Sequence, residues 1–316
     1  MREISVRLAR ASDLAAVVEM SQGIYSGHDY LPCIFIEWLN QPSRLIFVAE
    51  VGGKLVGLRA INIIDEGRTF ISQGLRIHPD FRGLGLSSRL IAEVHDYIRK
   101  KYPSVVRERF TTKSDNIERL AIQKKQGDRA VLDQDILAYH IPKNFLGNIS
   151  EHSTVQSSIK LHPYSKQDTE VILRESVANT LFQDNTLIID WEPFEALRSN
   201  IDCIFQEWDC LFADRSASEC RDGKWPKSFG HGRRSERVDC VHWVATIYTD
   251  DPVLFTAHVL RQLKAACGIT RDRFVFSTFH RPDMTEHGKQ LLTAGLSLQP
   301  VEFFTFGLRL FEKEFN

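Results

Sequence analysis

Alternating apolar and polar residues predict a group of strands in the first part of the chain. The stretch ISVRLA at 4–9 alternates as a half-buried strand does. A helix is expected after it, because Ser12 is a suitable N-cap and apolar residues then recur at helical spacing. Three further strands are expected as a meander, with a Gly-Gly turn after the first of them, at 44–51, 55–64 and 69–78.

The hydrophobic period changes from two to about 3.6 after residue 78, which predicts a helix. Its apolar face is formed by Leu86, Leu90, Ile91, Val94, Tyr97 and Ile98. A strand at 105–112, a helix at 115–128 that Gly127 ends as a C-cap, and a strand at 130–141 follow. Pro142 and the polar run at 147–158 predict a linker.

The second half repeats this order of elements loosely. Strands are expected at 185–194, 239–248, 272–280 and 300–311, and helices at 168–180, 252–268 and 285–296. The basic, glycine-containing stretch at 221–237 favours a mobile loop, with a lid as one role. The repeated order predicts two domains, at 1–143 and 158–316, joined by a linker at 144–157.

The composition is that of an ordinary globular protein. The 316 residues carry a net charge of −1, with 26% charged and 43% hydrophobic residues. Without a basic excess no nucleic-acid partner is expected, and without a run of eighteen apolar residues no membrane span is expected. The first residues lack a long apolar core, so no secretory signal is expected. Six scattered cysteines without C-x-x-C, and histidines without H-E-x-x-H spacing, predict no metal site and reduced thiols in the cytosol.

The stretch HPDFRGLGLSSRL at 78–90 predicts an anion site. Its glycines, Gly83 and Gly85, directly precede the helix, whose N-terminus presents unpaired N–H groups and a partial positive charge. A glycine-rich turn lets a phosphate approach that backbone closely. The G-K-[ST] ending of a Walker loop is absent, and the turn follows a late strand rather than the first strand of a dinucleotide-binding fold.

These motifs resemble the GNAT superfamily of N-acetyltransferases. Its pyrophosphate loop reads Q/R-x-x-G-x-G/A, and residues 82–87 read RGLGLS here. The stretch GLRIHPDFRG looks like the family's fourth strand and its exit, and DNIERLAIQKKQGD resembles its next helix. The resemblance implies acetyl-CoA as cosubstrate. Cofactor contacts are then expected from Leu75, Arg76, Ile77, Arg82, Gly83, Leu84, Gly85, Leu86, Ser87, Ser88 and Asn116.

The resemblance also implies the fold. It is an α/β (α+β) chain of two tandem GNAT-like domains, each with a mixed, largely antiparallel sheet flanked by helices. The second domain is expected to be degenerate, since its equivalent turn YTDDPVLFTAH has no glycine, and Asp250 and Asp251 would repel a pyrophosphate. This domain is therefore not expected to bind CoA, and a role as a wall of the acceptor site is open.

Transfer of an acetyl group to an amine needs a base, a polarised carbonyl and a leaving thiolate. A backbone N–H near Ile77 is expected to bind the carbonyl oxygen. Relatives often use a glutamate on the fourth strand as base and a late tyrosine as acid, but these positions hold Gln73 and Gln123 here. Gln73 is expected to hold a water that relays the proton. The alternative bases are Asp29, His78 and Glu66.

The stretch YSGHDYLP at 25–32 is expected to shape the acceptor site through Tyr25, Asp29 and Tyr30. Arg76 or Lys113 is expected to bind an acceptor carboxylate. This stretch, with NTLIIDWEPF in the second half, is similar to the histidine N-acetyltransferase family, which implies transfer to the α-amino group of free histidine in a ternary complex. Because Gln73 departs from the acidic residue expected there, another free amino acid, a protein or peptide amine, and a non-catalytic CoA-binding module stay open. No oligomeric state is predicted.

Overall fold

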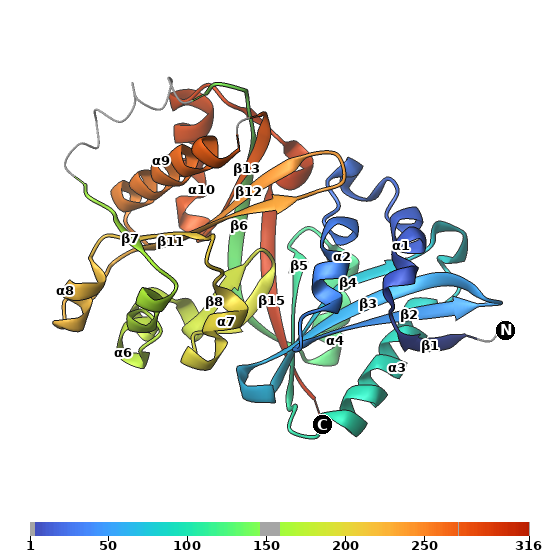
Figure 1. The fold of residues 1–316 in the computed structure, drawn as a ribbon. Coiled ribbons are helices and arrows are strands. Elements are labelled where there is room, and N and C mark those ends of the chain that lie inside the picture. The colour runs from blue at the N-terminus through green and yellow to red at the C-terminus, as the bar shows by residue number, and fades with distance from the viewer. Residues whose placement is uncertain (1–3, 146–158, 271, 316) are drawn as a thin grey trace. The chain divides into compact units, whose positions relative to one another are not determined.

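The computed structural model describes residues 4–145, 159–270 and 272–315 (Figure 1). Its contacts divide the chain into two compact units. The first unit consists of residues 1–110, 236–240 and 312–316, and the second of residues 111–235 and 241–311. Each unit is therefore built from segments that lie far apart in the sequence. The predicted linker falls largely outside the described residues, so the domain boundary at 144–157 stays a prediction.

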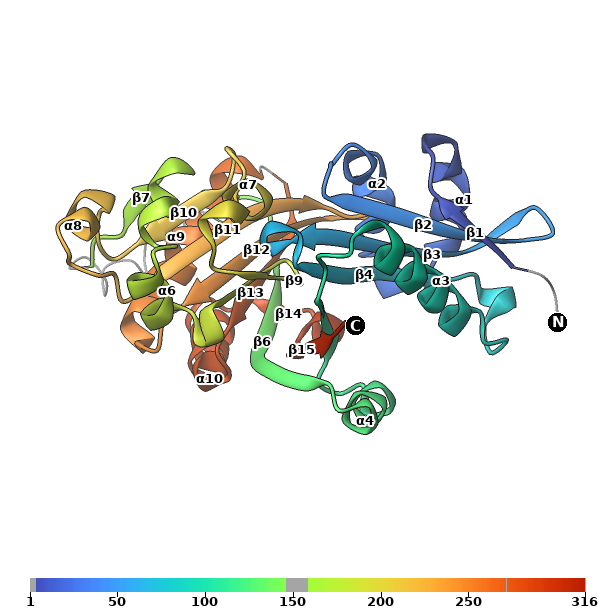
Figure 2. The same cartoon turned by 90° about the horizontal axis from the view of Figure 1, so that it is seen from below.

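The first unit is built on a sheet flanked by helices on both faces. Its strands are β1 (Ser5–Leu8), β2 (Arg44–Val51), β3 (Lys54–Ile64) and β4 (Thr69–Ile77), each antiparallel to the next, and the start of β5 (Arg107–Lys113), parallel to β4. This order confirms the predicted meander. One face packs against α1 (Leu14–Met20) and α2 (Leu31–Leu39), and the other against α3 (Leu86–Lys101), as Figure 2 shows.

A bulge interrupts the pairing of β3 with β4. Leu58 pairs with Arg76 and Ala60 pairs with Gln73, so β4 has one residue more than β3 in this interval. Gly74 takes a φ of 65°, a conformation that glycine adopts without a steric cost. Because side chains alternate along a strand, the extra residue places Arg76 on the face of Gln73, where unbroken alternation would have placed Leu75.

The second unit contains a sheet in the order β15-β6-β13-β12-β11-β10-β7, with β14 beside β6 and a separate β8–β9 hairpin. The bounds are β6 (Arg129–Ile141), β7 (His162–Tyr164), β8 (Thr186–Ile189), β9 (Glu192–Glu195), β10 (Cys210–Ala213), β11 (Phe229–Glu236), β12 (Val241–Tyr248), β13 (Phe274–His280), β14 (Gln299–Pro300) and β15 (Phe306–Glu314). The parallel pair β12–β13, joined by α9 (Pro252–Ile269), repeats the parallel pair β4–β5 joined by α3. This repetition agrees with the predicted tandem fold.

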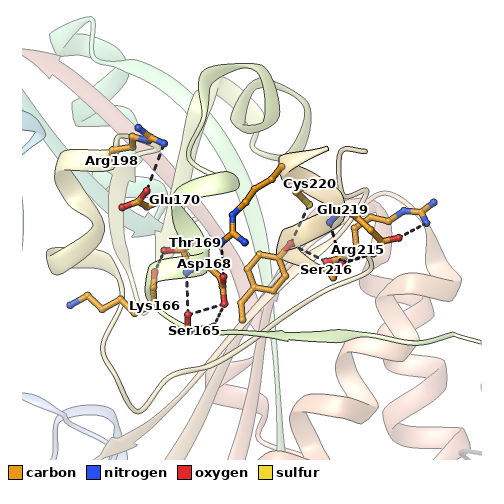
Figure 3. A network of polar contacts seen from close by, with 12 residues as sticks. Ser165, Lys166, Asp168, Thr169, Glu170, Arg198, Arg215, Ser216, Glu219 and Cys220 are labelled. Carbon is orange, nitrogen blue, oxygen red and sulfur yellow. Dashed lines mark hydrogen bonds and ion pairs between the residues drawn. The ribbon is translucent and has the colours of Figure 1, made fainter. Parts of the chain in front are cut away.

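The remaining helices of the second unit are short. They are α4 (Ile117–Gln126), α6 (Glu175–Leu181), α7 (Ile201–Ile204), α8 (Ala217–Arg221) and α10 (Thr285–Lys289). Gly127 ends α4 with a φ of 75°, which confirms the predicted C-cap. Polar contacts hold α8: Ser216 and Glu219 form a capping box at its start (Figure 3). Arg221, the last residue of α8, pairs with Asp168 at 3.0 Å.

Several predictions for the second half are wrong at least in part. The expected helix at 168–180 is interrupted between Val171 and Glu175, and residues 302–304 of the expected strand at 300–311 form a 3-10 turn. The stretch at 185–194 is not one strand but the β8–β9 hairpin, because Asp190 and Trp191 both take positive φ values, of 44° and 78°, in its turn. The stretch at 221–237 is not a loop throughout, because Phe229–Glu236 forms strand β11. Its Gly232 leaves room for α9, since a Cβ there would meet the Gln262 amide.

The final strand of each half of the sequence contributes to the other unit. β6 was expected to end the first domain, yet it pairs antiparallel with β13 over residues Asp135–Ile141 in the second unit. The last residues of β15 belong to the first unit, where Phe315 N donates to the Val106 carbonyl at 2.8 Å. Among the described residues, no helix is both long and apolar enough to cross a bilayer.

Candidate active site

A pocket of about 430 Å³ lies in the first unit, where β4 ends and α3 begins. It is lined by Ile24, Tyr25, Leu75, Arg76, Ile77, Phe81, Arg82, Gly83, Gly85, Leu86 and Ser87. The pocket therefore joins three segments that the sequence analysis selected separately: the glycine turn, the end of the fourth strand and the start of the YSGHDYLP stretch. Its size is within the range of small-molecule sites.

The glycine turn leaves the N-terminus of α3 without a side-chain cap. Gly85 is the N-cap of α3, with a φ of 71° and no side-chain cap, and Gly83 has a φ of 74°. A Cβ added to either glycine would meet nothing within 4 Å. The first-turn N–H groups of α3 thus lack a side-chain acceptor and lie at the edge of the pocket, which is the arrangement that binds a phosphate.

The equivalent helix of the second unit has its N-terminus closed. Asp251 is the N-cap of α9, and its Oδ1 accepts from Val253 N at 2.8 Å and from Leu254 N at 3.2 Å. A carboxylate therefore takes the N–H groups that a phosphate would need. This geometry gives a physical reason for the expectation that the second domain binds no CoA.

Strand β4 loses its parallel neighbour before it reaches the pocket. The paired residues of β4 and β5 end at Ile71 and Arg109, whereas β4 continues to Ile77. Leu75 is exposed, and the Arg82 side chain donates from Nε to the Ile77 carbonyl at 3.1 Å, which ties the turn to the strand. The last part of β4 is consequently available for strand-like pairing by a ligand.

The predicted acceptor residues meet around the guanidinium group of Arg76. Arg76 Nη2 donates to Asp29 Oδ1 at 2.9 Å, and its Cζ lies 5.5 Å and 5.7 Å from the ring centres of Tyr25 and Tyr30. Asp29 is 0% exposed and also accepts from Leu31 N at 3.2 Å, so it caps α2 as well as holding Arg76. Burial raises the pKa of Tyr30 to about 12, which keeps its hydroxyl neutral.

Two of the candidate bases, His78 and Glu66, lie outside the pocket lining. The ring of His78 is buried, with Nδ1 accepting from Asp80 N at 3.3 Å and Nε2 3.4 Å from the Glu19 carboxylate, so it caps the turn after β4. Glu66 lies exposed in the turn between β3 and β4.

Gln73 has a buried amide nitrogen with no hydrogen-bond partner among the described residues. Its side chain shares a face with Ala60, in the core under α1 and α2. A buried donor without an acceptor is costly unless water or a ligand satisfies it. This observation fits the predicted water at Gln73.

Lys113 and Asn116, predicted as binding residues, lie in the second unit and have partners there. Lys113 Nζ donates to the Phe303 carbonyl at 3.3 Å and lies 3.8 Å from the Phe306 ring centre, and burial lowers its pKa. Asn116 Oδ1 caps α4 by accepting from Arg119 N at 3.1 Å. These two residues therefore make contacts within the second unit, and neither of them lines the pocket.

A buried cluster of charged residues around Glu108, next to strand β4, was not predicted from the sequence. Glu108 Oε1 accepts from Arg59 Nη2 and from Ser72 Oγ, each at 2.6 Å, and its Oε2 lies 3.1 Å from His95 Nε2. Burial alone would raise the pKa of Glu108, but His95, Arg59 and Ser72 outweigh it and lower that pKa to about 2. In the sequence, the charged residues of RERF at 107–110 look like surface residues. Only the pairing of β4 with β5 shows that Glu108 belongs to a buried cluster.

Comparisons with known proteins relate both halves of the chain to N-acetyltransferases. The family model described as "Acetyltransferase (GNAT) family" matches residues 14–127, and "Histidine N-acetyltransferase, C-terminal" matches residues 157–281. A histidine N-acetyltransferase of Scomber australasicus is 31% identical over 61% of this chain and 60% of its own length. That of Xenopus tropicalis is 28% identical over 67% and 66%, and the human probable N-acetyltransferase 16 is 27% identical over 61% and 54%. The matched part thus spans less than two thirds of each of these relatives.

Solved structures agree on the tandem fold. A tandem GNAT protein from the clavulanic acid biosynthesis pathway aligns over 99% of both chains with a TM-score of 0.59 at 12% identity. A GCN5-related N-acetyltransferase from Sphaerobacter thermophilus aligns over 99% of this chain and 96% of its own, with a TM-score of 0.57 at 12% identity. The chain therefore has the tandem GNAT fold; its residues 14–127 match the GNAT family model, and its residues 157–281 match the model of the histidine N-acetyltransferase C-terminal domain.

Proposed function

We propose that this chain transfers the acetyl group of acetyl-CoA to the α-amino group of a free amino acid, with L-histidine as the first candidate. The observation that carries the proposal is the pocket itself, which joins the bare N-terminus of α3 to the guanidinium group of Arg76. One end suits a pyrophosphate and the other suits a carboxylate. Histidine is the substrate that the names of the curated relatives carry.

The cofactor would lie along β4 and the glycine turn. Backbone N–H groups from Arg82 to Ser88 would hold the pyrophosphate, because Gly83 and Gly85 leave the approach open. Leu75 to Ile77 would pair with the pantetheine arm like an added strand, since no paired residue of β5 covers them. No metal is required by this arrangement.

The transfer would run directly in a ternary complex. The amine nitrogen attacks the thioester carbonyl, a C–N bond forms and the C–S bond breaks. A backbone N–H near Ile77 would stabilise the oxyanion. The unsatisfied amide of Gln73 would hold a water that takes the amine proton towards solvent. With glutamine at position 123, the CoA thiolate would leave as such and take a proton from solvent.

The acceptor would bind through its carboxylate. Arg76 lines the pocket and is held by Asp29, so its position is set before the acceptor arrives. Tyr25 also lines the pocket and offers a hydroxyl to the acceptor. The proposal keeps the cytosolic location predicted from the cysteines, all six of which are thiols in the structure.

The test is CoA release from acetyl-CoA by the purified chain. It is run with each of the twenty free amino acids and with a set of peptides as acceptors. Turnover with free histidine or another free amino acid supports the proposal, and turnover with peptides alone would replace it with a protein N-acetyltransferase. Acetyl-CoA binding without transfer to any amine would leave a CoA-binding module and overturn the proposal.

A further inference from the structure

The turn at Ile24–Gly27 presents a side chain to the pocket from an unfavourable backbone conformation. Ile24 and Tyr25 line the pocket, and Tyr25 has a φ of 49°. Ser26 follows with a φ of 53°. A left-handed conformation is unfavourable for a residue with a Cβ, and two in succession persist only where the surrounding structure holds them. Glycine would adopt this backbone without a steric cost, so the tyrosine at position 25 points to a role for its side chain.

Hydrogen bonds from a remote segment hold this turn in place. Asp239 N donates to the Gly27 carbonyl at 3.0 Å, and Val238 N donates to the Asp29 carbonyl at 3.0 Å. All four residues belong to the first unit. The bonds reach the acceptor stretch, residues 25–32, through backbone atoms alone. They therefore do not depend on which side chain stands at position 25.

The side chain of Tyr25 lies against the guanidinium group that the proposed function assigns to the acceptor. Arg76 Cζ lies 5.5 Å from the centre of the Tyr25 ring, within the range of a cation–π contact. The ring of Tyr30 is 5.7 Å from Arg76, but of these two tyrosines Tyr25 is the one that lines the pocket. The ring of Tyr25 therefore stands where it can limit the orientation of the guanidinium group beside a bound acceptor.

The Arg76 guanidinium group has donors left for a ligand. Asp29 accepts from its Nη2 at 2.9 Å and from its Nε at 3.4 Å, and the Leu75 carbonyl accepts from its Nη1 at 3.1 Å. Of the five N–H bonds, one on Nη1 and one on Nη2 have no acceptor among the described residues. A bidentate carboxylate takes two such donors. The described residues that line the pocket include no acidic side chain that would compete with it.

We propose that Tyr25 is a positioning residue for the acceptor, whose ring holds the Arg76 guanidinium group in the orientation that binds the acceptor carboxylate. The left-handed backbone at Tyr25 is the strain that accompanies this placement. The inference rests on the proposed acetyl transfer and deepens it, because selection for a carboxylate then depends on the acceptor stretch as well as on strand β4. An amino-acid amide, which lacks the carboxylate, does not benefit from the ring in this way.

The test compares histidine with histidinamide as acceptors, or, if another amino acid is used better, that amino acid with its own amide. The measured quantity is the ratio of the two kcat/KM values, acid over amide. Tyr25→Leu and Tyr25→Asn both lack the ring, and each is expected to lower this ratio by about fivefold or more, through a higher KM for the acid. Asparagine tolerates a left-handed backbone, so Tyr25→Asn keeps the fold even if Tyr25→Leu does not. Tyr25→Phe keeps the ring and is expected to keep the ratio within about twofold of the wild type.

Ser26→Gly is the matched control. Ser26 is exposed, shares the left-handed conformation and does not line the pocket. The variant should therefore melt no lower than the wild type and keep its ratio of acid to amide.

Equal losses with the acid and the amide in Tyr25→Asn would show that the ring shapes the pocket for both acceptors, and would overturn the inference. An unchanged ratio in Tyr25→Asn would overturn it as well. So would a ratio in Tyr25→Phe as low as in Tyr25→Asn, because the hydroxyl would then act instead of the ring. A wild type that uses the acid and the amide equally would overturn it while leaving acetyl transfer in place. A wild type that transfers to no amine would instead refute the proposed function.

Discussion

The proposed phosphate-binding role of the glycine turn gives the sharpest prediction, through Gly85→Glu. The Cβ of residue 85 would meet no protein atom within 4 Å, so the new side chain enters the open approach to α3 without a clash. The substitution destabilises the fold only because a non-glycine residue must adopt the left-handed conformation, with a φ of 71°. This costs about 1–2 kcal/mol. For a domain of this size, that lowers Tm by about 2–8 °C.

The same substitution weakens acetyl-CoA binding by a larger free energy. A carboxylate about 5 Å from one pyrophosphate charge is repelled by about 3 kcal/mol at an effective dielectric constant of about 20. At about 1.4 kcal/mol per factor of ten, this weakens acetyl-CoA binding by about a hundredfold or more. Gly85→Gln has the same size and strain without the charge, so the ratio of the two Kd values isolates the electrostatic part.

Isothermal titration of acetyl-CoA into the variants, together with thermal melts, measures both quantities. Gly53→Glu is the control, because Gly53 has a φ of 80° in the β2–β3 turn and also has nothing within 4 Å of its Cβ position. It should show the same loss of Tm with unchanged binding. If Gly85→Glu binds acetyl-CoA within threefold of Gly85→Gln, the anion is not held at this turn and the assignment of the pocket fails.

Two further predictions concern buried contacts. Glu108→Gln leaves the Arg59 guanidinium without its buried counter-ion and should cost about 3–5 kcal/mol, seen as a lower Tm at pH 7. Because folding lowers the pKa of Glu108 from 4.5 to about 2, its stabilisation is complete above pH 4.5 and declines as the pH falls towards 2; a Tm difference from the wild type that does not shrink there would contradict this. Gly232→Ala would press on Gln262, which donates to the Cys210 carbonyl at 2.9 Å, and should cost about 1–3 kcal/mol in urea or thermal unfolding. Gly268→Ala in α9 has open space and should not lower the Tm, so equal losses in the two variants would discount the contact.

The sequence predicts the glycine turn and the helix that follows it well. The change of hydrophobic period after residue 78 predicts α3, and the helix indeed runs from Leu86 to Lys101. Glycines before a helix carry a local signal, because positive φ values and a bare N-terminus depend on neighbouring residues alone. Such features need no knowledge of the tertiary fold.

The surroundings of Arg76 are harder to predict from the sequence. Arg76 reaches Asp29 only because the bulge at Gly74 changes which face of β4 it occupies, and alternation alone predicts the opposite face. The charges of Glu108 and Arg237 give no sign of burial in the sequence, because their partners come from other strands and from a remote segment. Long-range pairing decides these positions, and neither periodicity nor spacing encodes it.

The composition of the first unit argues that residues 1–143 do not form a complete domain. A chain ending at 143 lacks residues 236–240, which hold the acceptor stretch, and residues 312–316. It thereby loses the ion pair of Glu312 with Arg109, at 2.9 Å, and the Phe315 ring that packs 4.9 Å from Phe70. Arg109 is 2% exposed, so its charge would lose a partner that burial makes necessary.

The fragment 1–143 is therefore expected to be insoluble or to melt without a cooperative transition, as followed by circular dichroism and size exclusion. Coexpression with a second fragment, 158–316, supplies both missing segments and should restore a soluble complex that binds acetyl-CoA. A fragment 1–143 that melts sharply and binds acetyl-CoA as the whole chain does would show that the exchanged segments are dispensable. In that case the site would depend on the N-terminal sequence alone.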